Sequence, residues 1–446
     1  MKTINVDFSV ITGKIKPMNA VNNGPLGVSE RGTSNFEDYT ALEIPYARNH
    51  DASFYDGYGG EHTVDVHRIF KNFDADENDP RSYVFEPTDK YTANTYKAGT
   101  KVFYRLGASI EHGYKYGTYP PRDFAKWARI CEHIIRHYNE GWANGFYYGI
   151  EYWEIWNEPD CRNHDGSNPC WQGTDEEFIE LYAVAATHLK KCFPNIKIGG
   201  PAFTAPKHGP LQLAFLKAVK ERGLPFDFYS FHRYFKKPEE VAIAAQTAIE
   251  SLDIFGIERP ELILNEWNYI KGWMCEDWLY SLRMERGLKG ASFIAGSMCI
   301  GQASELDMLM YYDARPCAMS GIFDTDTLAP RKGYYAFLGF KELRSLGNSA
   351  KIDAQKENIY SCAATNGSEH ALFFTRYEDT DEAEKEEICF SIQGINAKNG
   401  VRAEFYLLDA ENNASLVRKE VFSGEKFTIN LEINLFDTYL IKFSNI

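Results

Sequence analysis

The sequence predicts an α/β fold: a (β/α)8 barrel followed by a smaller C-terminal antiparallel β-sandwich. In the first two thirds of the chain, short β-rich runs alternate with helical patterns, as they do in parallel sheets built from βα units. After about residue 347, the runs become short and partly alternating, with turns rich in Asn, Gly and Asp between them. We therefore expect a barrel at 13–346 and a β-sandwich at 347–446, to which residues 1–12 add a strand.

Eight β-rich runs are the expected strands of the barrel. They cover residues 15–21, 42–50, 101–106, 149–156, 196–200, 226–232, 261–267 and 307–312. The clearest helix between them is predicted at 122–138, where apolar residues recur at three- and four-residue steps. A second is predicted at 175–191, opened by a capping box of Thr174 and Glu177. An open doubly wound sheet would carry a glycine-rich phosphate turn after its first strand, but the sequence there reads NNGP, which favours the barrel.

The C-terminal third predicts a set of short strands. These are expected at 359–363, 371–377, 387–392, 403–408 and 439–443. The charge run at 378–387 (EDTDEAEKEE) is expected to be a solvated hairpin loop.

Charge and cysteine content limit the partners and the location that we expect. Asp and Glu number 63 against 48 Lys and Arg, a formal net charge of −15, so neither nucleic acid nor an anionic membrane is an expected partner. Asp7 interrupts what would be the apolar core of a signal peptide, and nine cysteines without a CxxC pair indicate reduced thiols. We therefore expect a cytoplasmic protein, with a homo-oligomer left open. Cys161 and Cys170 lie nine residues apart in one segment and could pair if the chain were exported.

Two carboxylates occupy the positions where such a barrel places its chemistry, at the C-terminal ends of strands. Glu158 follows the fourth strand and Glu266 ends the seventh, each beside amide and indole side chains. Strands four and seven lie on opposite sides of the barrel mouth, so the two carboxyl groups can face each other. A single Glu at a strand end would be interpreted as part of an ion pair, but two facing carboxyl groups are what glycoside hydrolysis requires.

The surrounding motifs resemble a known group of enzymes. WNEP at 156–159 and NEWN at 265–268 are similar to the acid/base and nucleophile motifs of clan A glycoside hydrolases. With EYWEIWNEPD at 151–160, IPYARNHD at 44–51 and KPMNAVNNGP at 16–25, the chain most resembles glycoside hydrolase family 39. That family includes β-xylosidases, α-L-iduronidases and some α-L-arabinofuranosidases. The resemblance implies a barrel over roughly residues 14–345 with an accessory β-sandwich.

The resemblance also implies roles for individual residues in a retaining reaction. We expect this reaction to be exo-acting and to use no cofactor. Glu158 becomes the general acid/base and Glu266 the nucleophile. The implied substrate-binding residues are Asn157 at the sugar 2-hydroxyl, Arg48 beneath the nucleophile, His50 at sugar hydroxyls, His232 near the acid/base and Tyr234 near the nucleophile.

One departure from the clan pattern concerns the floor of the sugar site. Many clan members place a Trp at the end of strand eight, whereas this chain reads DMLMYYDA there, so Tyr311 or Tyr312 is expected to serve instead. Trp171, Trp273 and Trp278 follow strands four and seven, where an indole could stack on a sugar at the leaving-group side or simply pack in the core. We expect Trp273 among the binding residues, and the long segment 51–89 as a wall of the pocket.

The expected activity is hydrolysis of β-D-xylosides at a non-reducing end, with an oligosaccharide or other glycoside as substrate. An α-L-arabinofuranosidase is the nearest alternative. An inverting hydrolase and a non-catalytic carbohydrate-binding protein also stay open. No metal site is expected, because the HIIRH run of His133 and His137 lacks the Glu of a zinc motif.

Overall fold

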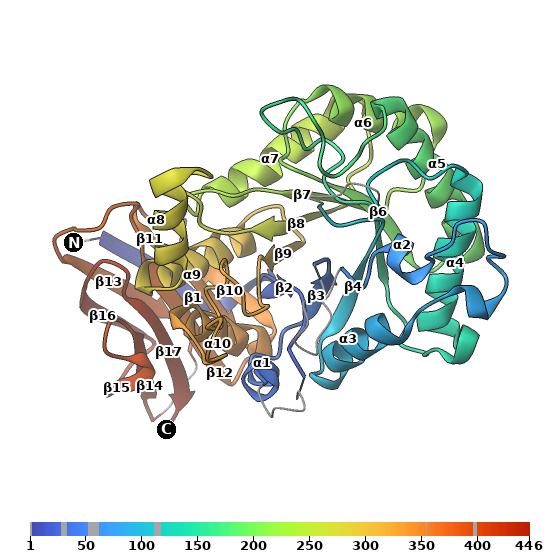
Figure 1. Cartoon of the computed structure of the whole chain (residues 1–446). Helices are drawn as coiled ribbons and strands as arrows, with labels where there is room; N and C mark the ends of the chain where they lie inside the picture. Colours follow the sequence, from blue (N-terminus) through green and yellow to red (C-terminus); the bar gives the residue numbers. More distant parts are fainter. Residues whose placement is uncertain (1, 28–33, 52–61, 111–116, 354, 396–398) are drawn as a thin grey trace.

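The computed structural model describes residues 2–27, 34–51, 62–110, 117–353, 355–395 and 399–446. It contains a closed parallel barrel of eight strands and a second, mostly antiparallel sheet of nine strands. Figure 1 shows the two units side by side, with the two chain termini at the nine-stranded sheet. The predicted fold class is therefore confirmed.

The barrel closes in chain order from β2 to β9, with parallel pairing throughout. Each of the eight expected runs overlaps one of its strands. The strands are β2 (Ala20–Asn22), β3 (Tyr46–Asn49), β4 (Lys101–Leu106), β5 (Tyr152–Ile155), β6 (Lys197–Phe203), β7 (Phe228–His232), β8 (Glu261–Trp267) and β9 (Met308–Tyr311).

Helices surround the barrel (Figure 1). They are α1 (Phe36–Ala41), α2 (Val66–Ile69), α3 (Glu86–Lys97), α4 (Phe124–Glu140), α5 (Asp175–Cys192), α6 (Pro210–Arg222), α7 (Glu240–Asp253), α8 (Cys275–Glu285), α9 (Leu288–Ala303) and α10 (Lys332–Leu346), with short 3-10 turns at Pro80–Ser82 and Trp142–Asn144. Both predicted helices are present as α4 and α5. The capping box also forms, because the Thr174 hydroxyl accepts from the Glu177 N–H while the Glu177 carboxylate accepts from the Thr174 N–H.

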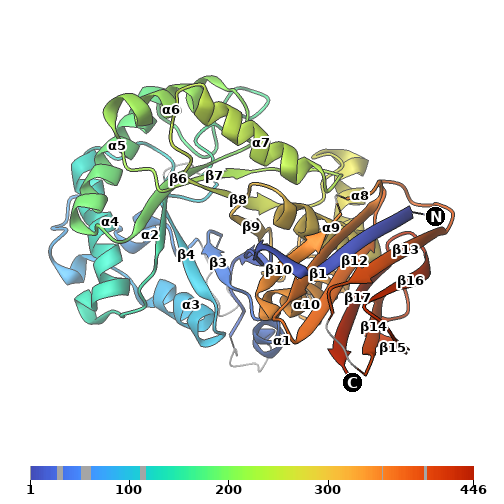
Figure 2. The ribbon, with the colours of Figure 1, turned by 180° about the vertical axis from the view of Figure 1, so that it is seen from behind.

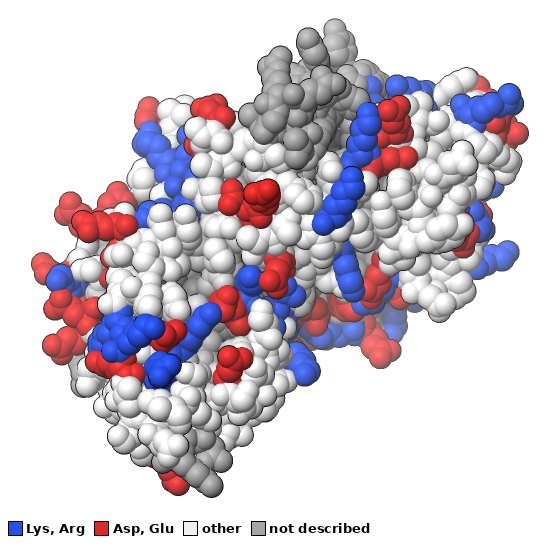
Figure 3. All heavy atoms as spheres, turned by 90° about the horizontal axis from the view of Figure 1, so that it is seen from below, with Lys and Arg blue, Asp and Glu red and all other residues white. Residues whose placement is uncertain are grey.

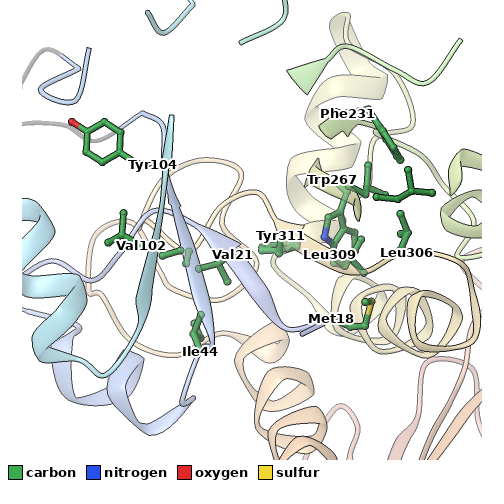
Figure 4. Close-up of a cluster of buried hydrophobic side chains, with 14 of the residues drawn as sticks. Met18, Val21, Ile44, Val102, Tyr104, Phe231, Trp267, Leu306, Leu309 and Tyr311 are labelled. Atoms are coloured by element: carbon green, nitrogen blue, oxygen red, sulfur yellow. The ribbon is translucent and has the colours of Figure 1, made fainter. Parts of the chain in front are cut away.

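The barrel core lies between the strands and the helices that cover them. Figure 4 shows part of it, with Val21, Val102, Trp267 and Leu309 pointing into one buried cluster. Strand residues that face the other way, such as Phe103, fill the barrel interior. Apolar contacts on both faces hold the strands in register, so polar groups at their C-terminal ends are fixed on a rigid frame.

The nine-stranded sheet has the order β15-β14-β17-β12-β11-β10-β1-β13-β16. Its strands are β1 (Lys2–Lys14), β10 (Asn348–Ile352), β11 (Ile359–Thr365), β12 (Glu369–Arg376), β13 (Glu386–Gln393), β14 (Val401–Leu408), β15 (Asn413–Phe422), β16 (Lys426–Ile433) and β17 (Thr438–Asn445). The N-terminal strand β1 pairs antiparallel with β10 and parallel with β13, so it lies inside this sheet, as Figure 2 shows from behind.

This sheet folds back on itself to enclose its own core. Phe374 of β12 packs on Phe390 of β13, with ring centroids 4.5 Å apart, although the two strands are not neighbours. Phe8 of β1 likewise meets Phe443 of β17 at 5.6 Å. The two halves of the sheet therefore face each other across an apolar layer, as in a sandwich.

The charge run after β12 is solvated over 381–385, as the sequence predicts, but it is not a hairpin loop. β12 pairs with β11 and β17, whereas β13 pairs with β1 and β16, so this segment crosses between distant parts of the sheet. It is also attached to the barrel, because Asp379 accepts a hydrogen bond from Tyr269 at 2.8 Å and lies 3.0 Å from the Lys289 ammonium. The start of this acidic run therefore makes a contact between the two units.

The sheet packs on the helices that follow the last barrel strands. Ser292 of α9 shares a 2.7 Å hydrogen bond with Thr375 of β12, and the Tyr377 hydroxyl donates to the Lys236 carbonyl at 2.6 Å. The second unit therefore supports the part of the barrel that carries β7 to β9.

The surface has mixed charge. On the face that Figure 3 shows, acidic and basic side chains are interspersed. Within the described ranges, no helix combines the length and the apolar character that crossing a bilayer requires.

Candidate active site

Glu158 and Glu266 meet at the C-terminal end of the barrel. Glu266 lies within β8, and Glu158 follows β5 by three residues. The Nδ1 atom of His232, at the end of β7, lies 2.7 Å from Glu158 Oε1 and 3.4 Å from Glu266 Oε2. One oxygen of each carboxyl group and a ring nitrogen of this histidine all lie within 4.8 Å of one another. The structure therefore brings the two predicted carboxyl groups together.

The backbone before Glu158 is held in an unusual conformation. Trp156 and Glu158 have positive φ values of 77° and 47°, which cost an L-residue roughly 1–2 kcal/mol each. The Glu158 N–H donates to the Ala202 carbonyl at 2.9 Å, which fixes the turn. Gly107 makes room for the indole, since a Cβ at this position would meet a Trp156 ring carbon at 2.8 Å. This strain aims the Glu158 side chain across the barrel mouth.

Arg48 at the end of β3 connects the groups around Glu266. Its guanidinium is fully buried and donates to Glu266 Oε1 at 2.8 Å and to Glu154 Oε2 at 2.7 Å. A third bond, at 2.7 Å, reaches the Asn157 amide oxygen and leaves the Asn157 amide nitrogen as its remaining polar atom for a ligand. Arg48 thus balances two carboxylates and orients both strand ends.

Glu154 belongs to this network, and sequence reasoning missed it. Its Oε1 atom accepts hydrogen bonds from Ser230 and Asn265, each at 2.6 Å, and its side chain is inaccessible to solvent. The available signal was a Glu within an otherwise apolar barrel strand, where a charge requires a buried partner.

Tyr234, two residues after β7, holds the second oxygen of Glu266. Its hydroxyl donates to Glu266 Oε2 at 2.9 Å, so Glu266 receives Arg48 on one oxygen and Tyr234 on the other. Both bonds favour the ionised carboxylate.

If Glu266 is the nucleophile that the resemblance implies, we expect the Tyr234→Phe variant to lower kcat roughly 10²-fold, because it removes one donor to a buried carboxylate whose charge would change in each step. Glu266 then ionises less readily, so the acid limb of the pH–rate profile moves to higher pH. Steady-state rates measured across pH test both effects. Lower kcat with an unmoved acid limb would contradict the assigned contact.

His50 lies on the other side of Glu266. Arg105 donates to His50 Nδ1 at 3.2 Å, so the ring proton is on Nε2. This Nε2 atom lies 3.4 Å from Glu266 Oε1 and 3.3 Å from Asp51 Oδ1. The Tyr312 hydroxyl donates to the other oxygen of Asp51, which places Tyr312 at the same mouth.

The two tyrosines considered for the sugar floor have different surroundings. Tyr311 is buried against Trp267, and its hydroxyl accepts from the Gly321 N–H, so it is a core residue and wrong as a floor candidate. Tyr312 lies 6.4 Å from the ring of Tyr234, edge to face, and is the one that reaches the site.

Aromatic side chains continue outward from Tyr234. The Trp273 ring stands edge-on to Tyr234 at 4.9 Å and stacks with Trp278 at 5.5 Å. Trp273 is 55% exposed, so one of its surfaces is free for a ligand. Trp171, by contrast, is fully buried beside Trp156 and packs in the core.

The surroundings of Glu158 and Glu266 give the two carboxyl groups different pKa values. Burial raises the pKa of Glu158 to about 8, and Asp160 adds to that increase. Burial also raises the pKa of Glu266, to about 7, against the opposing effect of the Arg48 cation. Burial lowers the pKa of His232 to about 4, so this ring is neutral near pH 7. The proton of the pair therefore resides on Glu158, and Glu266 is the first to ionise.

Two other expectations have different outcomes. His137 places both of its ring nitrogens on protein oxygens, those of Asp89 and the Trp142 carbonyl, so it is a structural residue of α4. The expected pocket wall at 51–89 falls partly on residues 52–61, which lie outside the described residues.

Fold and site together define a class: a (β/α)8 barrel with paired carboxyl groups at the ends of its fourth and seventh strands, here β5 and β8. Residues 65–255 match the model of glycosyl hydrolases family 39. The resemblance to glycoside hydrolase family 39 is thereby confirmed. The matched segment contains Glu158 and ends before Glu266.

Two curated relatives share part of the sequence. A β-xylosidase of Caldicellulosiruptor saccharolyticus is 29% identical over 146 residues, 32% of this chain and 27% of that protein. A β-xylosidase of Geobacillus stearothermophilus is 32% identical over 124 residues, 26% of this chain and 22% of that protein. The match thus spans about a quarter of the length of each.

Solved structures resemble the whole chain. A glucosidase from Croceicoccus marinus superposes with a TM-score of 0.80 at 20% identity, covering 100% of this chain and 99% of the other. A monomeric β-xylosidase from Caulobacter crescentus gives 0.70 at 16% identity, with both chains covered completely. At these identities the likeness shows a shared fold of barrel and accessory sheet.

Proposed function

We propose that this protein is a retaining, exo-acting glycoside hydrolase that cleaves β-D-xylosides at the non-reducing end. Glu158 acts as the acid/base and Glu266 as the nucleophile. The family match and the two β-xylosidases among its relatives support the substrate class. The exo action belongs to the same proposal and depends on a pocket wall built by the segment 51–89.

The observation that carries the proposal is the separation of the two carboxyl groups. Retaining glycosidases hold them roughly 5–5.5 Å apart, whereas inverting enzymes need roughly 6.5–9.5 Å to admit a water between them. Here one oxygen of Glu158 and one of Glu266 lie within 4.8 Å. Oxygens this close are consistent with the retaining geometry, in which a carboxylate attacks directly.

In the first step, Glu266 attacks the anomeric carbon while Glu158 donates its proton to the departing oxygen. Arg48 and Tyr234 each hold one Glu266 oxygen, which keeps the carboxylate ionised and limits its rotation. The Asn157 amide, fixed by Arg48, is placed to donate to the sugar 2-hydroxyl, a contact that strengthens in the transition state.

In the second step, the ionised Glu158 removes a proton from water, which attacks the anomeric carbon and releases Glu266. Once Glu266 is esterified, its negative charge is gone, and the loss of a neighbouring like charge favours ionisation of Glu158. Glu158 can therefore serve as a base in this step after serving as an acid in the first. His232, neutral and hydrogen-bonded to Glu158, keeps the carboxyl group oriented in both roles.

The first test is hydrolysis of nitrophenyl glycosides by the purified chain. The panel contains β-xyloside, α-L-arabinofuranoside, β-glucoside, β-galactoside and α-iduronide. We expect release from the β-xyloside. If only another glycoside of the panel were hydrolysed, its sugar would replace xylose as the proposed glycone. If folded protein hydrolysed none of them, a sugar-binding role would be favoured.

The pH–rate profile offers a more specific prediction for Glu158. Activity needs this group protonated and Glu266 ionised, so kcat/KM falls below about pH 7 as Glu266 gains its proton and above about pH 8 as Glu158 loses its own. In Glu158→Ala, we expect the alkaline limb to disappear for a nitrophenyl leaving group, which departs without protonation. Persistence of that limb in the variant would assign it to a different group.

A further inference from the structure

Two cysteines lie beside the acid/base, and the proposed reaction does not use them. The Cys170 thiol lies 3.9 Å from Glu158 Oε2. One carboxylate oxygen of Glu158 and the sulfurs of Cys161 and Cys170 all lie within 4.8 Å of one another. Glu158 Oε1 is already taken by His232, so the second oxygen is the one that faces the thiols.

The segment that carries these thiols is fixed by its own hydrogen bonds. The Asn168 side chain donates to the Pro159 carbonyl at 2.7 Å and accepts from the Cys170 N–H at 2.8 Å, which ties the two ends of the segment together. The Trp156 indole donates to the Cys170 carbonyl at 2.8 Å. Cys161 is held by a turn in which its N–H donates to the Glu158 carbonyl at 3.0 Å. The three ligand groups are therefore positioned before any ion arrives.

Two thiolates and one carboxylate are a donor set typical of zinc and of softer divalent cations. Tetrahedral bonds of about 2.3 Å to sulfur and about 2.1 Å to oxygen place such ligand atoms roughly 3.5–3.8 Å apart. The Cys170 sulfur and Glu158 Oε2 are 3.9 Å apart, and Cys161 lies within 4.8 Å of both, so small shifts bring all three to this spacing. Cys170 is fully buried, whereas Cys161 is partly exposed and gives an ion a route from solvent.

We propose that Glu158, Cys161 and Cys170 form an inhibitory site for a thiophilic divalent cation such as Zn²⁺. The ion displaces the two thiol protons to solvent and binds both sulfurs as thiolates together with the free carboxylate oxygen, with water completing the coordination. An occupied site removes the proton-donating group from the reaction, so the inhibition rests on the proposed function, whereas the binding itself does not.

Glu158 also belongs to a second possible metal site, with His232 and Glu266, whose ligand atoms are nitrogen and oxygen only. These ligand atoms also lie within 4.8 Å of one another. Only the site with Cys161 and Cys170 uses sulfur ligands, so cysteine variants show which of the two sites binds the ion. A third cluster, of Glu132, His188 and Cys192, lies on α4 and α5 and supplies a matched control far from the acid/base.

The test titrates Zn²⁺ into fully reduced protein, with two readouts. Alkylation of each cysteine by iodoacetamide, followed by peptide mass spectrometry, reports binding without reference to activity. Hydrolysis of the preferred nitrophenyl glycoside reports inhibition. We expect Zn²⁺ to protect Cys161 from alkylation and to inhibit, with a chelator reversing both effects.

In Cys161→Ser and in Cys170→Ser, we expect the inhibitory Zn²⁺ concentration to rise about tenfold or more, each relative to the metal-free rate of the same variant. The Cys192→Ser variant should be inhibited by the same Zn²⁺ concentration as the parent protein. If both cysteine variants were inhibited by the same Zn²⁺ concentration as the parent protein, the ion would be assigned to Glu158, His232 and Glu266, and the proposal would be overturned. Alkylation of Cys161 unaffected by Zn²⁺ would overturn it as well, even if the protein proved inactive on every glycoside.

Discussion

Replacing Glu266 with Ala is expected to lower kcat on the preferred aryl glycoside by a factor on the order of 10⁴–10⁶, as removal of a nucleophile does in other covalent enzymes. The carboxylate lies beneath the anomeric carbon in the proposed complex, and it is one acceptor of the buried Arg48 guanidinium. The remaining groups still bind the sugar, so KM should change far less than kcat. Initial rates over a range of substrate concentrations measure both quantities.

Added azide sharpens this result, because the small anion fits where the carboxylate was removed. In Glu266→Ala, azide attacks from the nucleophile side and gives a glycosyl azide of inverted configuration. In Glu158→Ala, azide attacks the glycosyl-enzyme from the opposite side and gives the retained product. Glu261, at the far end of β8 and paired with Lys197, provides the control variant Glu261→Ala, which should keep its activity. Identical azide products from both active-site variants would contradict the assigned roles.

The Arg48→Met variant has the second-largest expected effect, on stability and activity together. The guanidinium is fully buried between Glu154 and Glu266, so its loss leaves two carboxylates without their cation. Breaking a buried ion pair from one side costs about 3–5 kcal/mol. We expect a clear drop in the midpoint of thermal unfolding, together with nearly complete loss of turnover because Glu266 then retains a proton near neutral pH.

A second substitution separates the two consequences. Glu154→Gln neutralises the partner that does not touch the substrate, while its side-chain oxygen can still accept from Ser230 and Asn265. Arg48→Met combined with Glu154→Gln should recover part of the unfolding midpoint and none of the activity. If the double variant melted no higher than Arg48→Met alone, Arg48 would not be the main partner of Glu154.

The barrel could be predicted because each of its strands is buried on both faces. Such strands appear in the sequence as short apolar runs bounded by turns, and the eight runs lie where β2 to β9 form. The edge strand β15 was missed for the opposite reason. Its Leu416, Val417 and Val421 are largely exposed and lie among charged residues, so the two-residue alternation of a half-buried strand is weak.

The candidate site could be predicted only where a residue lies at the end of its strand. Glu158 and Glu266 were predicted on that basis, and the structure places them together. Glu154 was not, because its partner Arg48 comes from a strand about a hundred residues earlier, and no local pattern reports such a contact. The thiols beside Glu158 were considered only as a possible disulfide, since their proximity to a carboxyl group depends on how the segment after β5 folds back.

The most direct test of the account is to trap the covalent intermediate on Glu266. A 2-deoxy-2-fluoro xyloside with an activated leaving group serves as the probe. Fluorine at C2 slows both steps because it destabilises the oxocarbenium-like transition state. The activated leaving group speeds the first step again, so the covalent intermediate accumulates. Mass spectrometry of the intact protein and of its peptides reads out the adduct. The account predicts one fluoroxylosyl group per chain, attached to Glu266. Turnover of the parent xyloside with inverted product and no adduct, or an adduct on another residue, would contradict it.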